Sequence, residues 1–376
     1  MKKVVNFIKQ ETVLLVAWIL AIISNFFIPP GPDYIDYIDL RSLGILWSLM
    51  VIMQGLKENG VFKAIGMWLL AKTKQVWQLC TVLIFLCFFS SMFITNDVAL
   101  ITFVPFAVMM LQACKREELL IPVIVLQTIA ANLGSMLTPI GNPQNLYLYG
   151  ISGLDMGEFV LWMLPYTMVS AALLLLSILF LKGKAESVTV LVKEKQSCKK
   201  GSALAIGMYG LLFALALLVV GRVLSYVYLV VLVFLIVFTM EKKTLLHVDY
   251  SLLLTFVGFF IFTGNMGKIP VVHELIARLI VGREIGVGMA LSQFISNVPA
   301  TLLLAGFTTH YKQLLLGVNI GGLGTLIASM ASLISYKIFA NEYNSQKGKY
   351  LLWFTVTNII FAIILLMMTI VCVAYE

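Results

Sequence analysis

Charged residues are scarce in this sequence. They make up 12% of its 376 residues, against about a quarter in a typical soluble domain. Hydrophobic residues make up 61%, and the mean hydropathy is +1.00. A water-soluble fold of this length cannot cover so much apolar surface, which excludes a soluble domain. The composition predicts an all-α polytopic membrane protein.

Residue patterns that carry enzymatic or metal chemistry are also absent. The five cysteines form no close-spaced pair, which argues against a metal site or a disulfide framework. The segment HELIA at 273–277 begins like a zinc-protease helix, but Ala277 stands where the second histidine is needed. No serine–histidine or paired-aspartate motif lies at membrane depth. The sequence therefore predicts no enzyme and no cofactor apart from a coupling ion.

Long apolar runs are what the sequence does contain. The first run follows Lys2, Lys3 and Lys9 and has no small-residue cleavage site, so it reads as an uncleaved first span. Two apolar regions, 76–113 and 284–309, each have a polar interruption near the middle and are predicted to be helical hairpins. Two long spans, 119–149 and 311–341, contain breaks. The other predicted crossings lie near 11–28, 41–57, 158–181, 203–220, 224–240, 249–266 and 350–374.

The distribution of positive charge predicts the orientation. The formal net charge of +8 does not indicate nucleic-acid binding, because Lys and Arg cluster at the ends of apolar stretches. We place the N-terminus in the cytoplasm of a plasma (bacterial inner) membrane protein and let each hairpin enter and leave on one side. The C-terminus is then outside, and most basic residues are inside. The basic residues left outside are Arg41, Arg222, Lys268, Arg278, Arg283 and Lys312.

The two halves of the chain resemble each other. The hairpin centre SMFITNDVALI (91–101) aligns with SQFISNVPATL (292–302), and the broken span NLGSMLTPIGNPQN (132–145) aligns with NIGGLGTLIASMAS (319–332). Before each hairpin, an aspartate, Asp39 or Asp249, opens a span that ends near a glycine. Three matches in the same order indicate a duplication.

Counting crossings predicts that the two copies are inverted. The predicted organisation is a first repeat at 1–181, a cytoplasmic linker at 182–202, an inverting helix at 203–220 and a second repeat at 221–376. Each repeat contains one re-entrant hairpin and one broken helix. Inverted repeats with broken helices are typical of secondary transporters, whose binding site lies at the repeat interface.

Polar residues at the tips and breaks are the candidate binding groups. Non-helical backbone at membrane depth is tolerated only where protein buries it or it lines a water-filled cavity. Free helix carbonyls and amide or hydroxyl oxygens suit a small cation, and free N–H groups suit an anion. The alternative is that the tip residues only cap the helices that follow them. The candidate residues are Thr95, Asn96, Asp97, Gly141, Asn142, Pro143, Asn145, Ser296, Asn297, Thr325, Ala328 and Ser329.

Asp97 is the only charged residue between Lys74 and Lys115. A charge within the membrane is costly and indicates a functional site, here a proton or sodium site. The alternative is a carboxylate that stabilises the first turn of a helix through the dipole. Its counterpart in the second half, Val298, is neutral, so a charge at this position would act in one repeat only.

The motifs ITNDVALITFVPF, NLGSMLTPIGNPQNLYL and ISNVPATLLL resemble those of the citrate-transporter-like ion transporter superfamily. That group includes divalent anion/sodium symporters, arsenite permeases and sodium/proton antiporters. The resemblance implies that Asn96 and Asn297 bind Na⁺, that the third tip position contacts substrate, and that the protein is a homodimer. Both tips lack the third-position hydroxyl of dicarboxylate symporters. The first tip resembles arsenite permeases and antiporters, whereas TPIGNPQN is closer to the anion permeases.

The function expected from the sequence is secondary active transport of a small, anionic solute coupled to Na⁺ or H⁺. Two alternatives remain open: a cation/proton antiporter that uses Asp97, and an arsenite-type efflux permease. A channel, which would conduct without stoichiometric coupling, is a further rival. The expected partners are the solute, the lipid bilayer and a second copy of the chain.

Overall fold

The computed structural model describes residues 11–181, 183, 186–187 and 202–373. Within them the protein is helical throughout, and the one β-type contact is an isolated bridge between Gln75 and Ser187. Six of the described helices are long and apolar enough to cross a membrane. The prediction of an all-α polytopic membrane protein is therefore confirmed. Lys2, Lys3, Lys9, Cys198 and most of the predicted linker 182–202 lie outside the described residues.

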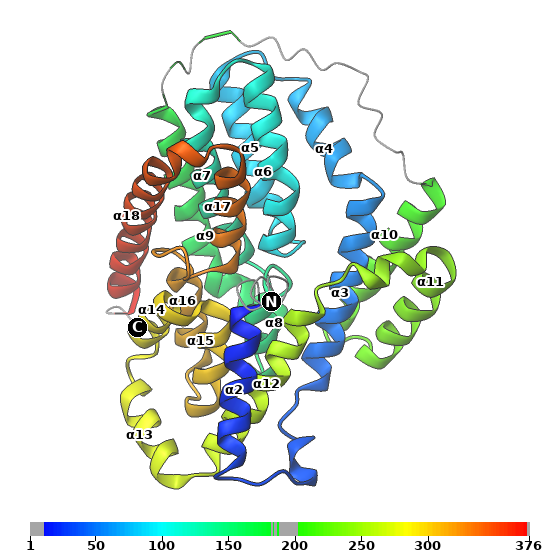
Figure 1. Cartoon of the computed structure of the whole chain (residues 1–376), viewed down its shortest axis with the longest axis vertical. Coiled ribbons are helices and arrows are strands. Elements are labelled where there is room, and N and C mark those ends of the chain that lie inside the picture. The colour runs from blue at the N-terminus through cyan, green and yellow to red at the C-terminus, as the bar shows by residue number, and fades with distance from the viewer. Residues whose placement is uncertain (1–10, 182, 184–185, 188–201, 374–376) are drawn as a thin grey trace.

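The helices follow one another as Figure 1 shows. In the first half they are α2 (Thr12–Asn25), α3 (Leu40–Glu58), α4 (Val61–Leu70), α5 (Val76–Ser90), α6 (Asn96–Ala113), α7 (Leu120–Ser135), α8 (Pro143–Ser152) and α9 (Met156–Leu179). In the second half they are α10 (Ala203–Val220), α11 (Tyr226–Leu246), α12 (Tyr250–Gly267), α13 (Pro270–Ile280), α14 (Glu284–Ile295), α15 (Asn297–Leu304), α16 (Tyr311–Gly321), α17 (Met330–Glu342) and α18 (Lys347–Val373).

Both predicted hairpins are pairs of helices that meet at a polar tip. Helices α5 and α6 join at Ser91–Thr95, and α14 and α15 join at Ser296. Both long spans are broken as predicted, α7 from α8 and α16 from α17. Figure 1 shows α5 and α6 in the upper half of the molecule and α14 and α15 in the lower half. The two tips therefore face the middle of the molecule from opposite ends.

Aspartate side chains cap the starts of α3 and α12. The side chain of Asp39 accepts a hydrogen bond from the Ser42 N–H at the start of α3, and Asp249 accepts one from Leu252 at the start of α12. Such caps satisfy one of the four free N–H groups of a helix. The two aspartates that open matched spans in the sequence thus have the same structural role.

One helix, α11, extends clearly beyond its predicted end. The span predicted at 224–240 is followed by a kink at Glu241, whose φ/ψ values of −142° and 58° are not helical. Helix α11 continues beyond this kink to Leu246. The apolar pattern ends where the kink begins, and the polar last turns fold over the end of α3. Hydropathy alone does not mark this added segment because Lys242 and Lys243 interrupt it.

Glycines let the hairpins approach the broken spans closely. A Cβ at Gly134 of α7 would lie 2.1 Å from the Phe88 carbonyl oxygen of α5, and one at Gly321 of α16 would lie 2.8 Å from the Met289 Cα of α14. Gly134 aligns with Gly321, and Phe88 with Met289, in the two halves of the sequence. The same close contact thus occurs in both halves.

Replacing Gly134 by alanine should destabilise the protein, because the backbone of α5 must move away from the new methyl group. We expect a loss of about 1–3 kcal/mol in the free energy of unfolding, as for other overpacked sites. The control is Gly207→Ala on α10, where a Cβ meets nothing within 4 Å and should stabilise by about 0.4–1 kcal/mol. Thermal unfolding in detergent compares the two. Equal melting temperatures would contradict the close contact.

Candidate functional site

Each hairpin tip is bonded to a broken span through the backbone. The N–H of Asn96 donates to the Gly141 carbonyl at 3.2 Å, and the N–H of Asn297 donates to the Ala328 carbonyl at 2.9 Å. These are equivalent positions in the two aligned halves. In each half, an otherwise free amide of a helix start is satisfied by a carbonyl of a helix break. The four polar segments therefore form two bonded pairs, one in each half, and side-chain bonds of Asn132 and Asn319 join the pairs into one centre.

The hydroxyl residues of the tips do not act as helix caps. Thr95 and Ser296 are the N-cap residues of α6 and α15, and neither side chain makes a capping hydrogen bond. The capping alternative is therefore wrong for these two residues. At the first tip, the Asn96 Oδ1 instead accepts from the Asp97 N–H at 2.9 Å. Its second lone pair is left for another partner.

Two buried asparagines connect the halves across the centre. Asn132 of α7 accepts through its Oδ1 from Asn96 Nδ2 at 3.1 Å and from Ser329 Oγ at 2.9 Å. Asn319 of α16 accepts through its Oδ1 from Asn142 Nδ2 at 3.2 Å and donates to Asn145 Oδ1 at 2.7 Å. Asn132 and Asn319 align in the sequence, as do Asn142 and Ser329. Each asparagine thus bonds the start of the broken helix of the other half.

Side-chain amides also hold the ends of the first half-helices. At the end of α7, Asn145 Nδ2 donates to the carbonyls of Ser135, Met136 and Thr138 at 3.2–3.3 Å. At the end of α16, Gln293 Nε2 donates to the carbonyls of Gly321 and Leu323 at 2.8 and 2.9 Å. These bonds satisfy carbonyls that a helix end leaves free.

Threonines complete this arrangement in both halves. Thr138 donates to the Met92 carbonyl, and Thr325 donates to the Gln293 carbonyl at 3.0 Å. Both donor and acceptor positions are equivalent in the alignment. The breaks are therefore ordered by side chains rather than left open.

The two tips differ in backbone conformation. Ser296 has φ +77° and ψ 153°, whereas Thr95 has φ −60° and ψ 146°. A positive φ is costly for a residue with a Cβ, by about 1–3 kcal/mol, and such strain is concentrated at functional sites. The second tip is therefore under strain that the first tip lacks.

Asp97 lies on a cavity of about 260 Å³ beside the first tip. One carboxylate oxygen of Asp97 is buried without a hydrogen-bond partner among the described residues. Thr95 and Pro143 line the same cavity from the tip and from the start of α8. On the facing side are Gln54 and Lys57 of α3, together with His247 and Asp249 between α11 and α12. A single small cavity thus holds two carboxylates and one lysine.

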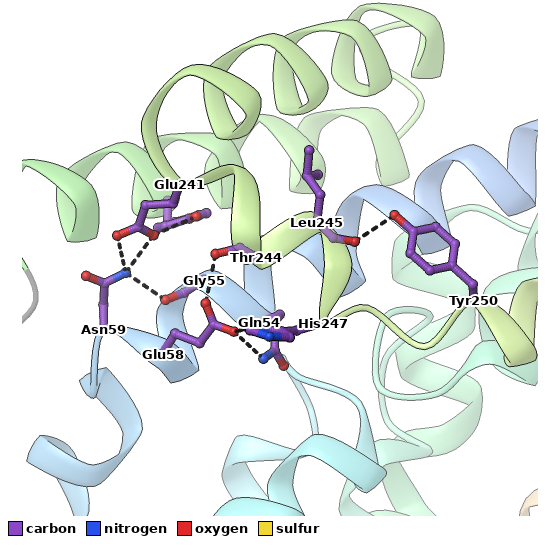
Figure 2. Close-up of polar contacts among 10 residues, drawn as sticks. Gln54, Gly55, Glu58, Asn59, Glu241, Thr244, Leu245, His247 and Tyr250 are labelled. Atoms are coloured by element: carbon purple, nitrogen blue, oxygen red, sulfur yellow. Dashed lines mark hydrogen bonds and ion pairs between the residues drawn. The ribbon is translucent and has the colours of Figure 1, made fainter. Parts of the chain in front are cut away.

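Two residues of the cavity lining, Gln54 and His247, belong to a polar cluster that we call the rim. Figure 2 shows the contacts of this cluster. The Glu58 carboxylate accepts from Gln54 Nε2 at 2.7 Å and from Thr244 Oγ1 at 2.8 Å, and lies 2.7 Å from His247 Nδ1. The kink at Glu241 brings these residues of α11 onto the end of α3. The rim therefore ties His247, which faces the cavity, to a fixed carboxylate.

Glu241 itself anchors the kinked segment. Its carboxylate accepts from Asn59 Nδ2 at 3.1 Å and from the Tyr209 hydroxyl at 2.9 Å. The Tyr209 ring lies against Gly55, where a Cβ would lie 2.1 Å from the ring. The ends of α3, α10 and α11 are thereby held together as one unit.

The structure separates the residues predicted from sequence into two groups, with Thr325 outside both. Thr95, Asp97 and Pro143 line the cavity, and Thr325 is exposed at the second break. The others are buried in the bonded centre: Asn96, Gly141, Asn142, Asn145, Ser296, Asn297, Ala328 and Ser329.

Sequence reasoning missed several residues that the structure brings to the site. Asn132 and Asn319 were matched in the internal alignment, and that identity was a usable signal. Asp249 was matched with Asp39 only as the start of a span, and Lys57 and His247 gave no such signal, because each lies at a helix end where a charged residue is ordinary. His247, which reads in the sequence as one of three scattered histidines, instead contacts Glu58 and lines the cavity.

The known proteins that this chain resembles include several transporters. The family model described as citrate transporter matches residues 4–313. An uncharacterized transporter of Methanocaldococcus jannaschii is 32% identical over 358 residues, 95% of this chain and 94% of the relative. The inner membrane protein YbiR of Escherichia coli is 31% identical over 326 residues, 85% of each chain. The silicon efflux transporter LSI3 of Oryza sativa subsp. japonica is 31% identical over 155 residues, 41% of this chain and 31% of the relative.

Two substitutions at Ser296 distinguish the effect of backbone strain from the effect of losing the hydroxyl group. Ser296→Ala and Ser296→Gly both remove the hydroxyl, but only glycine adopts φ +77° without cost. We expect the glycine variant to be more stable than the alanine variant by about 1 kcal/mol. Thermal unfolding measures the difference. If the alanine variant were as stable as the glycine variant, the tip would not be strained.

Removing the Asn319 side chain should weaken the contact between the two halves. Asn319→Ala leaves the Asn145 Oδ1 buried without its partner, which costs about 1–3 kcal/mol. The control is Asn358→Ala, another buried asparagine, whose Nδ2 bonds only the Phe354 carbonyl of its own helix. Thermal unfolding should show a larger loss for Asn319→Ala. A larger loss for the control would contradict the role given to Asn319.

Proposed function

This chain belongs to the citrate transporter family, and we propose that it is a secondary active transporter of a small anionic solute. Coupling is to Na⁺ or H⁺, and the protein is a membrane transporter rather than an enzyme. The observation that carries the proposal is the Asp97 carboxylate, which has an unpartnered buried oxygen and lines a cavity beside a helix break. An ionisable group within a membrane-spanning region is a functional-site hypothesis by default, and we assign Asp97 to the coupling ion.

The cavity lies between two groups of helices that can play different parts. The tip and break side contributes α6, α8 and α17, and the other side contributes α3 and the segment before α12. We assign the hairpins and broken helices to a moving transport part and α3, α10, α11 and α12 to a scaffold. Movement of one against the other would open the cavity to alternate sides of the membrane.

The predicted inverted repeats are part of this proposal. Support comes from the hydrogen bonds that recur in aligned positions, among them Asn96 to Gly141 and Asn297 to Ala328. An inverted pair of hairpins would bring two sites to the middle of the bilayer, one in each half. On family resemblance we further expect a homodimer, in the bacterial inner membrane with the N-terminus cytoplasmic and the C-terminus outside.

The charges of the cavity suggest how ion and solute are coupled. With Asp97 ionised, the first tip favours a cation, and Asn96 has an oxygen lone pair free for Na⁺. Asn297 is the proposed Na⁺ ligand of the second tip. Lys57 faces the same cavity and makes no ion pair within the described residues. An anion beside Lys57 and a cation at Asp97 would each lie next to a group of opposite charge, and each ion would offset the charge that the other brings into the cavity.

A cation/proton antiporter is the second candidate. The observation in its favour is that Asp249 provides a second carboxylate on the cavity that holds Asp97. Two carboxylates around one small cavity could exchange a metal cation for protons without an anion. An efflux permease of the arsenite type is a third version of the same fold. One relative carries the name of a silicon efflux transporter, although it aligns with 41% of this chain.

Thermal unfolding of the purified protein tests the solute class first. A ligand of the folded state raises its stability by RT ln(1 + [L]/Kd). The measurement covers Na⁺, Li⁺ and pH, each with and without phosphate, sulfate, succinate, citrate or arsenite. We expect an anion to stabilise only when Na⁺ or acid is also present. Stabilisation by cations alone, with no effect of any anion, would favour the antiporter.

Asp97→Asn should remove coupling while leaving the fold intact. We expect coupled uptake into proteoliposomes to fall at least about tenfold, the change that about 1.4 kcal/mol of binding free energy gives. The cation-dependent shift in melting temperature should disappear as well. Asp36→Asn, in an exposed loop, is the matched control and should transport normally. Retention of full Na⁺- or H⁺-dependent uptake in Asp97→Asn would exclude Asp97 as the coupling site.

Lys57→Gln tests the proposed place of the anion. If Lys57 attracts the solute, the variant should lose the anion-dependent stabilisation but keep the cation-dependent one. Lys63→Gln, on α4 and away from the cavity lining, is the matched control. An unchanged anion response in Lys57→Gln would place the solute elsewhere.

A further inference from the structure

A groove runs along the outside of the protein between α14 and α18. Two hollows of about 590 and 410 Å³ form it, and they share Gly286 of α14 and Leu366 of α18. Figure 1 shows the C-terminal end of α18 beside α14. We call this feature the α14–α18 groove. It is separate from the Asp97 cavity, because no lining residue is common to both.

Small residues of α14 keep the groove open. Gly286 and Ala290 lie one helical turn apart and are exposed, and a Cβ at Gly286 would meet nothing within 4 Å. The facing wall of α18 is apolar and includes Ile363, Leu366 and Ile370. If this part of the protein lies in the bilayer, hydrocarbon chains of lipids fill the α14–α18 groove.

The end of the groove at the start of α14 has a different chemistry. Arg283 is exposed there, and its guanidinium makes no ion pair or hydrogen bond with the described residues. The adjacent Glu284 is only 3% exposed, and its carboxylate is engaged by Thr308 Oγ1 at 2.9 Å and His310 Nδ1 at 2.8 Å. The neighbouring carboxylate therefore points away from Arg283 and into the protein. One cation remains at the polar end.

We propose that the α14–α18 groove binds a phospholipid, with an acyl chain between α14 and α18 and the phosphate at Arg283. The order of groups along the groove, apolar and then cationic, is the order of a phospholipid from tail to head. A guanidinium pairs with a phosphate through two parallel hydrogen bonds. Basic sites between membrane helices bind anionic head groups in the same way. An anionic lipid should therefore bind more tightly than a zwitterionic one.

The position of the groove connects the lipid to the second helix break. At its far end the groove is lined by Gln293, Leu323 and Gly324. Gln293 is the residue that holds the last carbonyls of α16 and bonds the Thr325 N–H at 2.9 Å. A lipid tail in the groove would pack against the residues that order the break. Occupancy should then stabilise the folded protein.

Native mass spectrometry of the purified, delipidated protein tests the proposal. Phosphatidylglycerol or phosphatidylcholine is added back, and retained lipid is counted. We expect the wild type to retain one phosphatidylglycerol per chain more firmly than phosphatidylcholine. Arg283→Gln should reduce the retention of phosphatidylglycerol roughly tenfold, as loss of a charge-assisted hydrogen bond does. Gly286→Leu and Ala290→Leu should reduce the retention of both lipids by filling the channel.

Two matched controls identify the site. Arg278→Gln removes an exposed arginine of α13 that pairs with Glu274 on its own helix. Gly207→Leu adds the same side chain at an open, exposed position of α10. Both should bind lipid as the wild type does, and unfolding curves identify any variant that is misfolded. Equal retention in the wild type and the three groove variants would overturn the proposal. So would a change from dimer to monomer in Gly286→Leu and Ala290→Leu, because the groove would then be a subunit contact.

Discussion

The structure depends on one constraint: backbone amides and carbonyls in the middle of an apolar protein need partners inside it. A broken helix within a membrane frees several such groups at once. Here the tip amides of Asn96 and Asn297 are paired with break carbonyls of Gly141 and Ala328. Side chains of Asn145 and Gln293 satisfy the carbonyls that remain. The breaks are stable because the hairpin tip and the broken helix of each half supply partners to each other, and the polar groups so gathered are those that can handle an ion.

This arrangement also explains why the centre and the cavity have different residue types. The bonded centre is built from amides and hydroxyls, which are neutral and can satisfy backbone groups without a charge at low dielectric. The charged residues Lys57, Asp97 and Asp249 lie instead around the cavity, where a solute or water can reach them. The bonded centre and the charged cavity are therefore built from separate sets of residues.

Most of the fold could be predicted from the sequence, because hydropathy and helix breakers act locally. The helix predicted at 203–220 is α10 with those limits, and both hairpins turn at the predicted polar residues. What the sequence could not give is contact between distant segments. Asp249 lines the Asp97 cavity from the segment after α11, whose kink at Glu241 no periodicity marks, and Lys57 lines it from the end of α3. Asn132 and Asn319 were visible as an aligned pair, yet their partners Ser329 and Asn142 follow only from the crossing of the two broken helices.

The difference between the two tips affects the relative energies of two conformations, the one open to one side of the membrane and the one open to the other. On the proposed inverted arrangement, two identical halves would exchange conformations as the protein opened first to one side and then to the other, and those states would be degenerate. In this chain the two halves differ at two equivalent positions of the tips. The acid Asp97 corresponds to the neutral Val298, and Ser296, with a positive φ, corresponds to Thr95, with an ordinary φ. On that proposed arrangement, the empty protein would have a preferred resting side. Selection for uptake or for export could act by changing this bias alone, with the solute site left intact.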